Sequence, residues 1–320
     1  MTKNPSIDFL KGLLTLLVMG GHAMELVGRH DLLLWLGSGL RMPLMIGISG
    51  YLLNVTRIRT EAARALFQRY STRLLLPWLF ATILYLIISG WSVGWATPLD
   101  PILRPPFHLW YVPVLVFLIF VARLIPRSPL LLLVMGTPVS LATMYGFGLD
   151  HGPVGTSFFA PDSRFLRYPV YFFFGMLMAE RAFPKRYLPV CLLLTLLGLW
   201  WWSGLYRDGH RLAYVPARLL MCLGLISLLP SLSALRLRFA PLNLIGQDSL
   251  FFYLWHPLIM GLLMAGGMHS FTMVIASVPL LFMVSRLAAR APFIGRILGA
   301  APDRRVDHKA PGGPVALAGT

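Results

Sequence analysis

Residues 7–22 read IDFLKGLLTLLVMGGH, an apolar run that nevertheless holds Asp8, Lys11 and His22. A helix needs about 20 mostly apolar residues to cross a bilayer, and this run continues to about residue 28 with Glu25 near its end. An ionisable group at bilayer depth costs roughly 2.5–3.5 kcal/mol on insertion scales. Each of these side chains is therefore a functional hypothesis by default.

Helical phasing places three of these groups on one stripe. At about 100° per residue, Lys11 and His22 differ by about 20° around the axis, and Asp8 lies within about 60° of both. His22 lies roughly 16 Å further along the axis than Lys11. The stripe predicts a polar passage inside a bundle, although an Asp8–Lys11 ion pair, snorkelling of Lys11, or an interhelical hydrogen bond of His22 would also explain it.

The composition places the whole chain in a membrane. Of the 320 residues, 57% are hydrophobic and 12% charged, and the mean hydropathy is +0.71. Soluble domains hold about 45–50% apolar and about 25% charged residues. The net charge of +16 does not predict nucleic-acid binding, because the basic residues lie in short segments between apolar blocks. Cys191 and Cys222 lie inside such blocks and offer no metal-ligand spacing, so no metal is expected.

The apolar blocks predict an all-α, polytopic helical bundle, because a spanning segment must satisfy its backbone internally. About ten spans are expected, at 7–28, 32–54, 74–95, 109–125, 129–149, 165–182, 187–206, 214–234, 242–266 and 271–290. Most of the 28 lysines and arginines fall on the side that holds the N-terminus. Since basic residues mark the cytoplasmic side, both termini are predicted to be cytoplasmic.

Residues 1–292 are thus one transmembrane domain, which includes a basic segment at 56–73 and is followed by a tail at 293–320. Residues 56–73 are basic and predict an interfacial cytoplasmic helix, which serves either as a lipid-headgroup anchor or as a ligand site. Residues 293–320 are rich in Gly, Pro, Ala and Arg and predict a cytoplasmic tail that is disordered from about residue 300.

Other polar residues in or beside the spans are candidates for binding substrate or supporting the site. Ser49 lacks the flanking pattern of a nucleophile elbow, and packing is favoured for its segment. Pro257 follows His256 and predicts a kink that frees a backbone carbonyl. The candidates are Glu25, Arg41, Ser49, Trp110, Tyr253 and His256. Trp110 belongs to His108-Leu109-Trp110-Tyr111, which an aromatic belt at the outer interface would equally explain.

Polar residues between the spans on the outer side give weaker signals. They are Asp150, His151, Asp162, Arg164, Arg167, Asp208 and His210. A solvated loop explains each of them at least as well as a substrate contact does.

Several motifs in order resemble the acyltransferase 3 family of integral membrane O-acyltransferases, and specifically its fucose 4-O-acetylase-like branch. The resemblance covers nearly the whole chain. Its elements are Ile7 to Gly12, Gly20-Gly21-His22, Phe67 to Arg73 leading to Pro77, His108 to Tyr111, Phe172 to Gly175, and Gly246 to Pro257. Each is weak, and the series in this order is specific.

The resemblance implies ten helices, cytoplasmic acetyl-CoA as acyl donor, and a sugar acceptor on the other side. It implies that His22 is the catalytic residue, with Lys11 and Asp8 shaping the passage around it, and that Arg69 and Arg73 contact donor phosphates. Two departures are present: Lys11 stands where many members have arginine, and three residues separate Arg69 from Arg73 where about two are expected.

The sequence therefore predicts an enzyme of the bacterial inner membrane that moves an acetyl group from acetyl-CoA to a sugar hydroxyl. The acceptor would be an exopolysaccharide or its lipid-linked precursor, and membrane lipids would surround the protein. His22 would act as a general base or as an acyl relay, and the sequence leaves both routes open. A transporter or flippase of the precursor, and a non-catalytic partner in a polysaccharide complex, are the alternatives.

Overall fold

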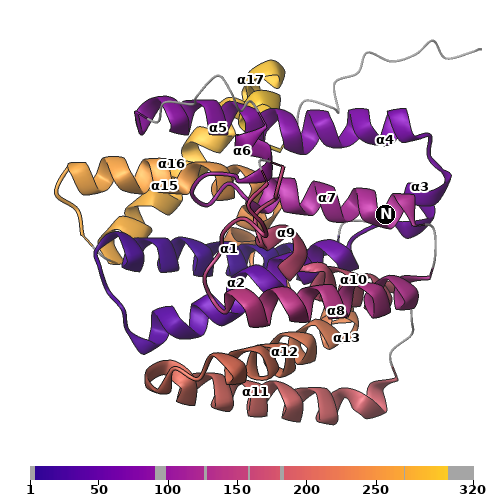
Figure 1. The fold of residues 1–320 in the computed structure, drawn as a ribbon. Coiled ribbons are helices and arrows are strands. Elements are labelled where there is room, and N and C mark those ends of the chain that lie inside the picture. The colour runs from indigo at the N-terminus through magenta and orange to yellow at the C-terminus, as the bar shows by residue number, and fades with distance from the viewer. Residues whose placement is uncertain are drawn as a thin grey trace, which may run out of the picture.

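The computed structural model describes residues 4–90, 99–125, 128–157, 159–180, 184–269 and 271–301. These residues form helices, and the pairing of extended backbone among them is limited to an isolated bridge between Pro153 and Asp162. The long helices run in a common direction across the molecule, from α4 and α5 at one edge to α11 at the other (Figure 1). The predicted all-α membrane bundle is confirmed.

The first half of the chain contains α1 (Pro5–Leu26), α2 (Leu32–Tyr51), α3 (Val55–Thr60), α4 (Ala63–Tyr70), α5 (Leu76–Ile88), α6 (Asp100–Leu103), α7 (Tyr111–Leu124) and α8 (Pro129–Phe147). The second half contains α9 (Arg164–Arg167), α10 (Pro169–Glu180), α11 (Leu188–Asp208), α12 (Arg211–Ser227), α13 (Leu229–Ala234), α14 (Ala240–Gln247), α15 (Ser249–Ala265), α16 (Phe271–Arg290) and α17 (Pro292–Leu298).

The described part of each predicted span is mainly helical, but the spans differ in regularity; residues 91–95 of the third span and 181–182 of the sixth lie outside the described residues. Within the described ranges, 7 helices are long and apolar enough to cross a membrane, and 8 are if the bent pair α14–α15 is one span. Helix α7 is shorter, and the span expected at 165–182 is divided between α9 and α10 because Pro169 begins a new helix after Tyr168. The count of ten and the side of both termini stay predictions.

The basic segment 56–73 spans α3 and α4, and its position at a membrane interface stays a prediction. Its second half, α4, continues through a π-helical turn at Ser71–Leu75 into α5, so that Ala63–Ile88 forms one helix of 26 residues. A π-helical turn inserts an extra residue into the helix and often lies at a functional site. The turn here contains Arg73.

Helices α14 and α15 meet at an angle of 89°, and the sequence did not predict this bend within the span at 242–266. Asp248 lies at the bend and is 1% exposed. Its carboxylate accepts hydrogen bonds from Ser285 (2.7 Å), Arg286 and the backbone N–H of Ala301 (3.0 Å). The bend is therefore held by α16 and by the segment that follows α17.

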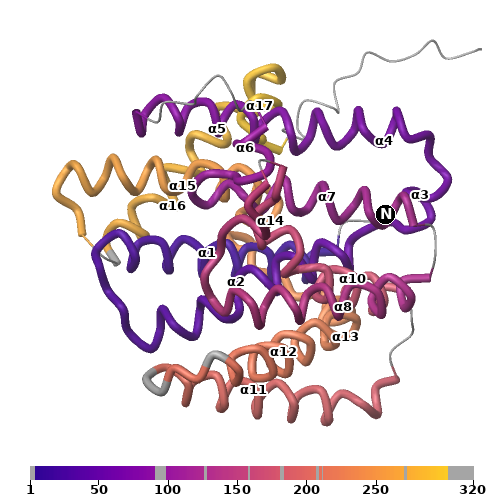
Figure 2. Tube along the Cα trace, in the orientation of Figure 1, coloured from indigo at the N-terminus to yellow at the C-terminus, as the bar shows by residue number. Residues whose placement is uncertain are grey.

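Close approach of helices depends on glycine at a few crossings. A Cβ atom at Gly12 would lie 2.0 Å from the carbonyl oxygen of Leu242, and one at Gly246 would lie 1.8 Å from the carbonyl oxygen of Asp8. Small residues let helix backbones pack this closely in membrane proteins. Helices α1 and α14 are thus tightly apposed near the middle of the molecule (Figure 2).

The first residues of the predicted tail are ordered. Residues 292–298 form α17, which packs against α16 and α5. The tail from residue 302 onward, predicted to be disordered, lies outside the described residues.

Candidate active site

Three histidines from distant parts of the sequence meet in the bundle. His22 comes from α1, His108 precedes α7, and His256 lies within α15. Their ring centroids are 6.0 Å apart for His22 and His108, 5.3 Å for His22 and His256, and 5.5 Å for His108 and His256. His108 and His256 are buried, whereas the side chain of His22 is 30% exposed. His22 is therefore the most exposed member of this cluster.

Glu25 fixes the orientation of His22. The Nδ1 atom of His22 lies 2.9 Å from Oε2 of Glu25, one helical turn further along α1. The other carboxylate oxygen of Glu25 accepts a hydrogen bond from Arg41, at 3.3 Å. With Nδ1–H donating to the carboxylate, the lone pair of the imidazole is on Nε2. This arrangement of carboxylate and imidazole suits a general base.

Arg41 reaches Glu25 across the surface of α1, where Gly21 leaves room for it. A Cβ atom at Gly21 would lie 1.4 Å from Nη1 of Arg41, whereas a Cβ atom at Gly20 would meet nothing within 4 Å. Nη1 also contacts the carbonyl oxygen of Val18 at 3.5 Å. The glycine before His22 therefore accommodates the guanidinium that holds Glu25.

Helix α15 continues across Pro257, and a tyrosine of α5 bridges two backbone groups beside it. The hydroxyl of Tyr85 donates to the carbonyl of Leu254 and accepts from the N–H of Leu258, both at 3.0 Å. It thereby replaces a direct bond between these two groups. His256 donates from Nδ1 to the carbonyl of Phe252 at 2.8 Å, and its Nε2 atom is buried with no hydrogen-bond partner in the described part of the chain.

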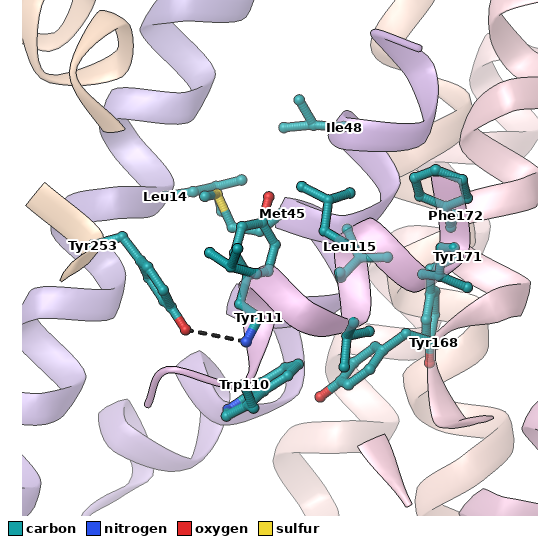
Figure 3. Packing of buried hydrophobic residues seen from close by; sticks show 14 of the residues in the cluster. Leu14, Met45, Ile48, Trp110, Tyr111, Leu115, Tyr168, Tyr171, Phe172 and Tyr253 are labelled. Atoms are coloured by element: carbon teal, nitrogen blue, oxygen red, sulfur yellow. Dashed lines mark hydrogen bonds between the residues drawn. The ribbon is translucent and has the colours of Figure 1, made fainter. Parts of the chain in front are cut away.

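Tyrosine side chains tie the histidine cluster to α7. The hydroxyl of Tyr253 donates to the carbonyl of His108 and accepts from the N–H of Tyr111 at 3.3 Å (Figure 3). Ser49 lies 2.8 Å from the hydroxyl of Tyr111 and donates to the carbonyl of Met45 at the same distance. Tyr253 and Ser49 therefore position neighbouring elements, and neither contacts the ring of His22.

A cavity of about 370 Å³ opens beside His22 and His108. This volume lies within the range of small-molecule sites, about 300–1,000 Å³. Trp110 lines the cavity and stacks on Tyr168, with ring centroids 5.1 Å apart (the two labelled side chains in Figure 3). The guanidinium of Arg164 lies 5.3 Å from the centre of the Trp110 ring. Trp110 is thus part of a cavity wall and not an exposed interfacial anchor.

The wall of the cavity beyond Trp110 is basic. Arg164, Arg167 and Arg218 line it, together with His151. Arg164 forms an ion pair with Asp162 at 2.7 Å. Burial by itself would raise the pKa of Asp162. Hydrogen bonds from His151 and Arg164 outweigh this effect and lower the pKa to about 2. The Asp162 carboxylate is therefore ionised at neutral pH and balances the charge of Arg164.

Asp8 and Lys11 lie apart from the cavity. They pair with each other at 3.8 Å, which is the alternative explanation that the sequence left open. Both side chains are partly exposed, and the backbone of Asp8 packs against α14. The shared stripe predicted for α1 is therefore divided along its length, with an ion pair at one end and His22 at the other.

Arg69 and Arg73 differ in their surroundings. Both terminal nitrogens of Arg69 donate to the carboxylate of Glu61 at 2.5 Å. Arg73 is exposed within the π-helical turn. Arg73 is therefore more accessible to an anionic ligand than Arg69, whose donor fork is already occupied.

A family model described as an acyltransferase domain matches residues 4–289, which is nearly the whole chain. The chain belongs to the acyltransferase 3 family. The fucose 4-O-acetylase-like branch is a finer assignment that this match does not resolve.

A shorter similarity links this acyltransferase to the nodulation protein NolL of Sinorhizobium fredii (strain NBRC 101917 / NGR234). The two sequences are 40% identical over 82 residues, which is 23% of this chain and 22% of that protein. The aligned region thus spans about a fifth of the relative. No solved structure matches the acyltransferase.

The site of this membrane acyltransferase contains residues that the sequence analysis did not select. The sequence pattern marks His108 only as part of the His108-Leu109-Trp110-Tyr111 motif and gives no signal for Tyr85 or Arg218. Arg164 and Arg167 were explained equally well by a solvated loop, but they are only 6% and 4% exposed. In the described ranges, no group of three His, Cys, Asp or Glu side chains is arranged to hold a metal ion.

Proposed function

We propose that this acyltransferase moves an acetyl group from acetyl-CoA to a hydroxyl of a sugar, with His22 as the general base. The sugar is part of an exopolysaccharide or its lipid-linked precursor, and the protein works in the bacterial inner membrane. The observation that carries the proposal is the His22–Glu25 contact at the mouth of a cavity large enough for a sugar ring.

In the proposed reaction, Nε2 of His22 takes the proton of the acceptor hydroxyl as its oxygen attacks the carbonyl carbon of the thioester. The new C–O bond forms and the C–S bond breaks. The departing thiolate of coenzyme A then takes the proton from the imidazolium, which returns His22 to its neutral state. General acid–base catalysis of this kind contributes about 10²–10⁴-fold to a rate.

The donor reaches His22 from the side of α4 and the π-helical turn. Arginine suits the phosphates of coenzyme A because its planar fork binds two oxygens at once. Arg73 makes the first contact, and Arg69 joins when Glu61 releases it. Lys11 and Asp8 precede His22 on α1, so we place them along the path by which the donor reaches His22.

The test is the acetyl content of cell-surface polysaccharide in a strain whose gene encodes His22→Ala. We expect acetylation to fall by about 10²-fold or more at unchanged protein level. His30→Ala is the matched control, because His30 is exposed just beyond α1 and does not line the cavity. Normal acetylation with His22→Ala would disprove the role of His22.

If the polysaccharide of the wild-type strain carries no acetyl group, the proposal that it is the acceptor is wrong. Reconstitution in liposomes tests the alternative of a transporter or flippase. Movement of a lipid-linked sugar without acyl transfer would favour that alternative.

A further inference from the structure

In the described part of the chain, two arginines of the cavity wall have uncharged hydrogen-bond partners. Arg167 donates to the carbonyls of Leu149 and Asp150, and its Nε atom is buried with no hydrogen-bond partner in the described part of the chain. Arg218 donates from Nε to the carbonyl of Gly39 at 3.2 Å and hydrogen-bonds the side chain of Tyr168. The partners found for both guanidinium groups are therefore uncharged.

These guanidinium groups are deeply buried and near each other. Arg167 is 4% and Arg218 is 5% exposed, and the two are close enough to repel electrostatically. A buried charge is costly unless it is paired, and two adjacent cations add their mutual repulsion to that cost. Asp162 attracts Arg167, but its carboxylate also pairs with Arg164 and His151, so that one carboxylate serves three arginines of the cavity wall. The cavity therefore has an excess of positive charge.

The predicted topology puts this charge on the acceptor side of the membrane. The cavity is lined by residues of the loop between α8 and α9, including His151, and this loop lies on the side opposite the basic α4 segment in the charge distribution. The coenzyme A phosphates, which we place at Arg73, do not explain why this cavity is also basic. An anionic group on the acceptor would explain the basic cavity.

We infer that the cavity beside His22 binds an acceptor sugar that carries an anionic group, held by Arg167 and Arg218. This inference rests on the proposed function and narrows its substrate class to acidic acceptors. The anion is a carboxylate of the sugar ring or a phosphate attached to it, since arginine forks fit both groups. The same contact would orient the sugar so that one of its hydroxyls faces Nε2 of His22.

The experiment measures binding to the full-length protein in nanodiscs of phosphatidylcholine, whose headgroups carry no net charge. The probes are D-glucuronate, α-D-glucose 1-phosphate and D-glucose, titrated calorimetrically without acyl donor. We expect at least one acidic sugar to bind about tenfold or more tightly than glucose, because hydrogen bonds to charged groups are the strongest available. Preference for glucuronate identifies a carboxylate, and preference for the phosphate ester identifies a phosphate.

Variants locate the binding to the cavity. Arg218→Gln and Arg167→Gln should each remove the preference for the acidic sugar, while Arg29→Gln should keep it, since Arg29 pairs with Asp31 outside the cavity. If the glutamine variants fail to fold, the comparison of charged and neutral sugars on the wild-type protein still tests whether acidic sugars are preferred. Equal binding of all three sugars, or no binding of the acidic ones, would overturn the inference and leave the arginines a purely structural role.

Acetyl transfer is measured separately, because this binding assay contains no acetyl-CoA. A protein that binds acidic sugars but transfers no acetyl group would contradict the proposed function and not the acidic site. Transfer to neutral acceptors only, with no acidic preference in binding, would contradict the acidic site and leave the proposed function intact.

Discussion

Nδ1 of His22 and Oε2 of Glu25 are 2.9 Å apart, on successive turns of one helix that crosses the bundle. The carboxylate decides which imidazole nitrogen carries the proton and therefore which one can accept another. Arg41 binds the same carboxylate from α2. The nitrogen that we propose as the base is thus set by a contact between two helices, and the first two predictions address this contact.

Glu25→Gln should lower kcat for acetyl transfer by about tenfold or more, since a charged hydrogen bond contributes roughly 1.5–3 kcal/mol. KM for both substrates should change little, because Glu25 positions the base and does not line the cavity. Steady-state kinetics of purified protein measure both constants. Glu180→Gln, an exposed change at the end of α10, should leave them unaltered. An increase in KM with unchanged kcat would assign Glu25 to substrate binding instead.

Gly21→Ala and Gly20→Ala form a matched pair. The methyl group at position 21 would collide with the Arg41 guanidinium, whereas the one at position 20 meets open space. We expect Gly21→Ala to lower acetyl transfer about tenfold or more by displacing the charged partner of Glu25. Gly20→Ala should keep activity and gain up to about 1 kcal/mol of helix propensity. Equal activity of the two variants would show that Arg41 has no part in the reaction.

Asp248→Ala should destabilise the protein by about 3–5 kcal/mol, because it leaves the Arg286 guanidinium without its partner at a buried bend. The free energy of unfolding in mixed micelles measures this loss. Asp100→Ala removes a partly exposed ion pair with Arg104 and should cost no more than about 1 kcal/mol. Similar losses for the two variants would mean that the bend does not depend on the carboxylate.

Arg73→Gln should raise KM for acetyl-CoA about tenfold, since it removes the charged contact that we propose to the phosphates, and should leave kcat nearly unchanged. Arg186→Gln is the control, because Arg186 is exposed and basic but stacks on Tyr187 away from the π-helical turn. Kinetics at varied acetyl-CoA concentration decide. If KM stays constant in Arg73→Gln, the donor phosphates bind elsewhere.

The sequence was sufficient to predict the class of fold, because long apolar blocks leave the backbone few alternatives to helix in a membrane. It also predicted that His22 occupies a polar site, since a buried imidazole near two glycines needs an explanation. It did not predict the 89° bend at Asp248, because both arms of the bend are apolar and the carboxylate that holds them is bonded by residues far along the chain.

The composition of the cavity depends on tertiary contacts that spacing does not reveal. Helical phasing groups residues on one helix, so it joined Asp8 and Lys11 to His22, although the structure leaves those two as a separate pair. His108, Arg167 and Arg218 reach the cavity from three other segments. Arg167 follows a loop and Arg218 lies within a span, and neither position has a periodic pattern that predicts a shared cavity.

The origin of the three clustered histidines has a consequence for biosynthesis. His22 emerges from the ribosome before His108, and His108 emerges long before His256. A chain released early, or one whose last helices have not entered the membrane, lacks part of the cluster. The cluster is therefore complete only when α15 has been inserted beside α1.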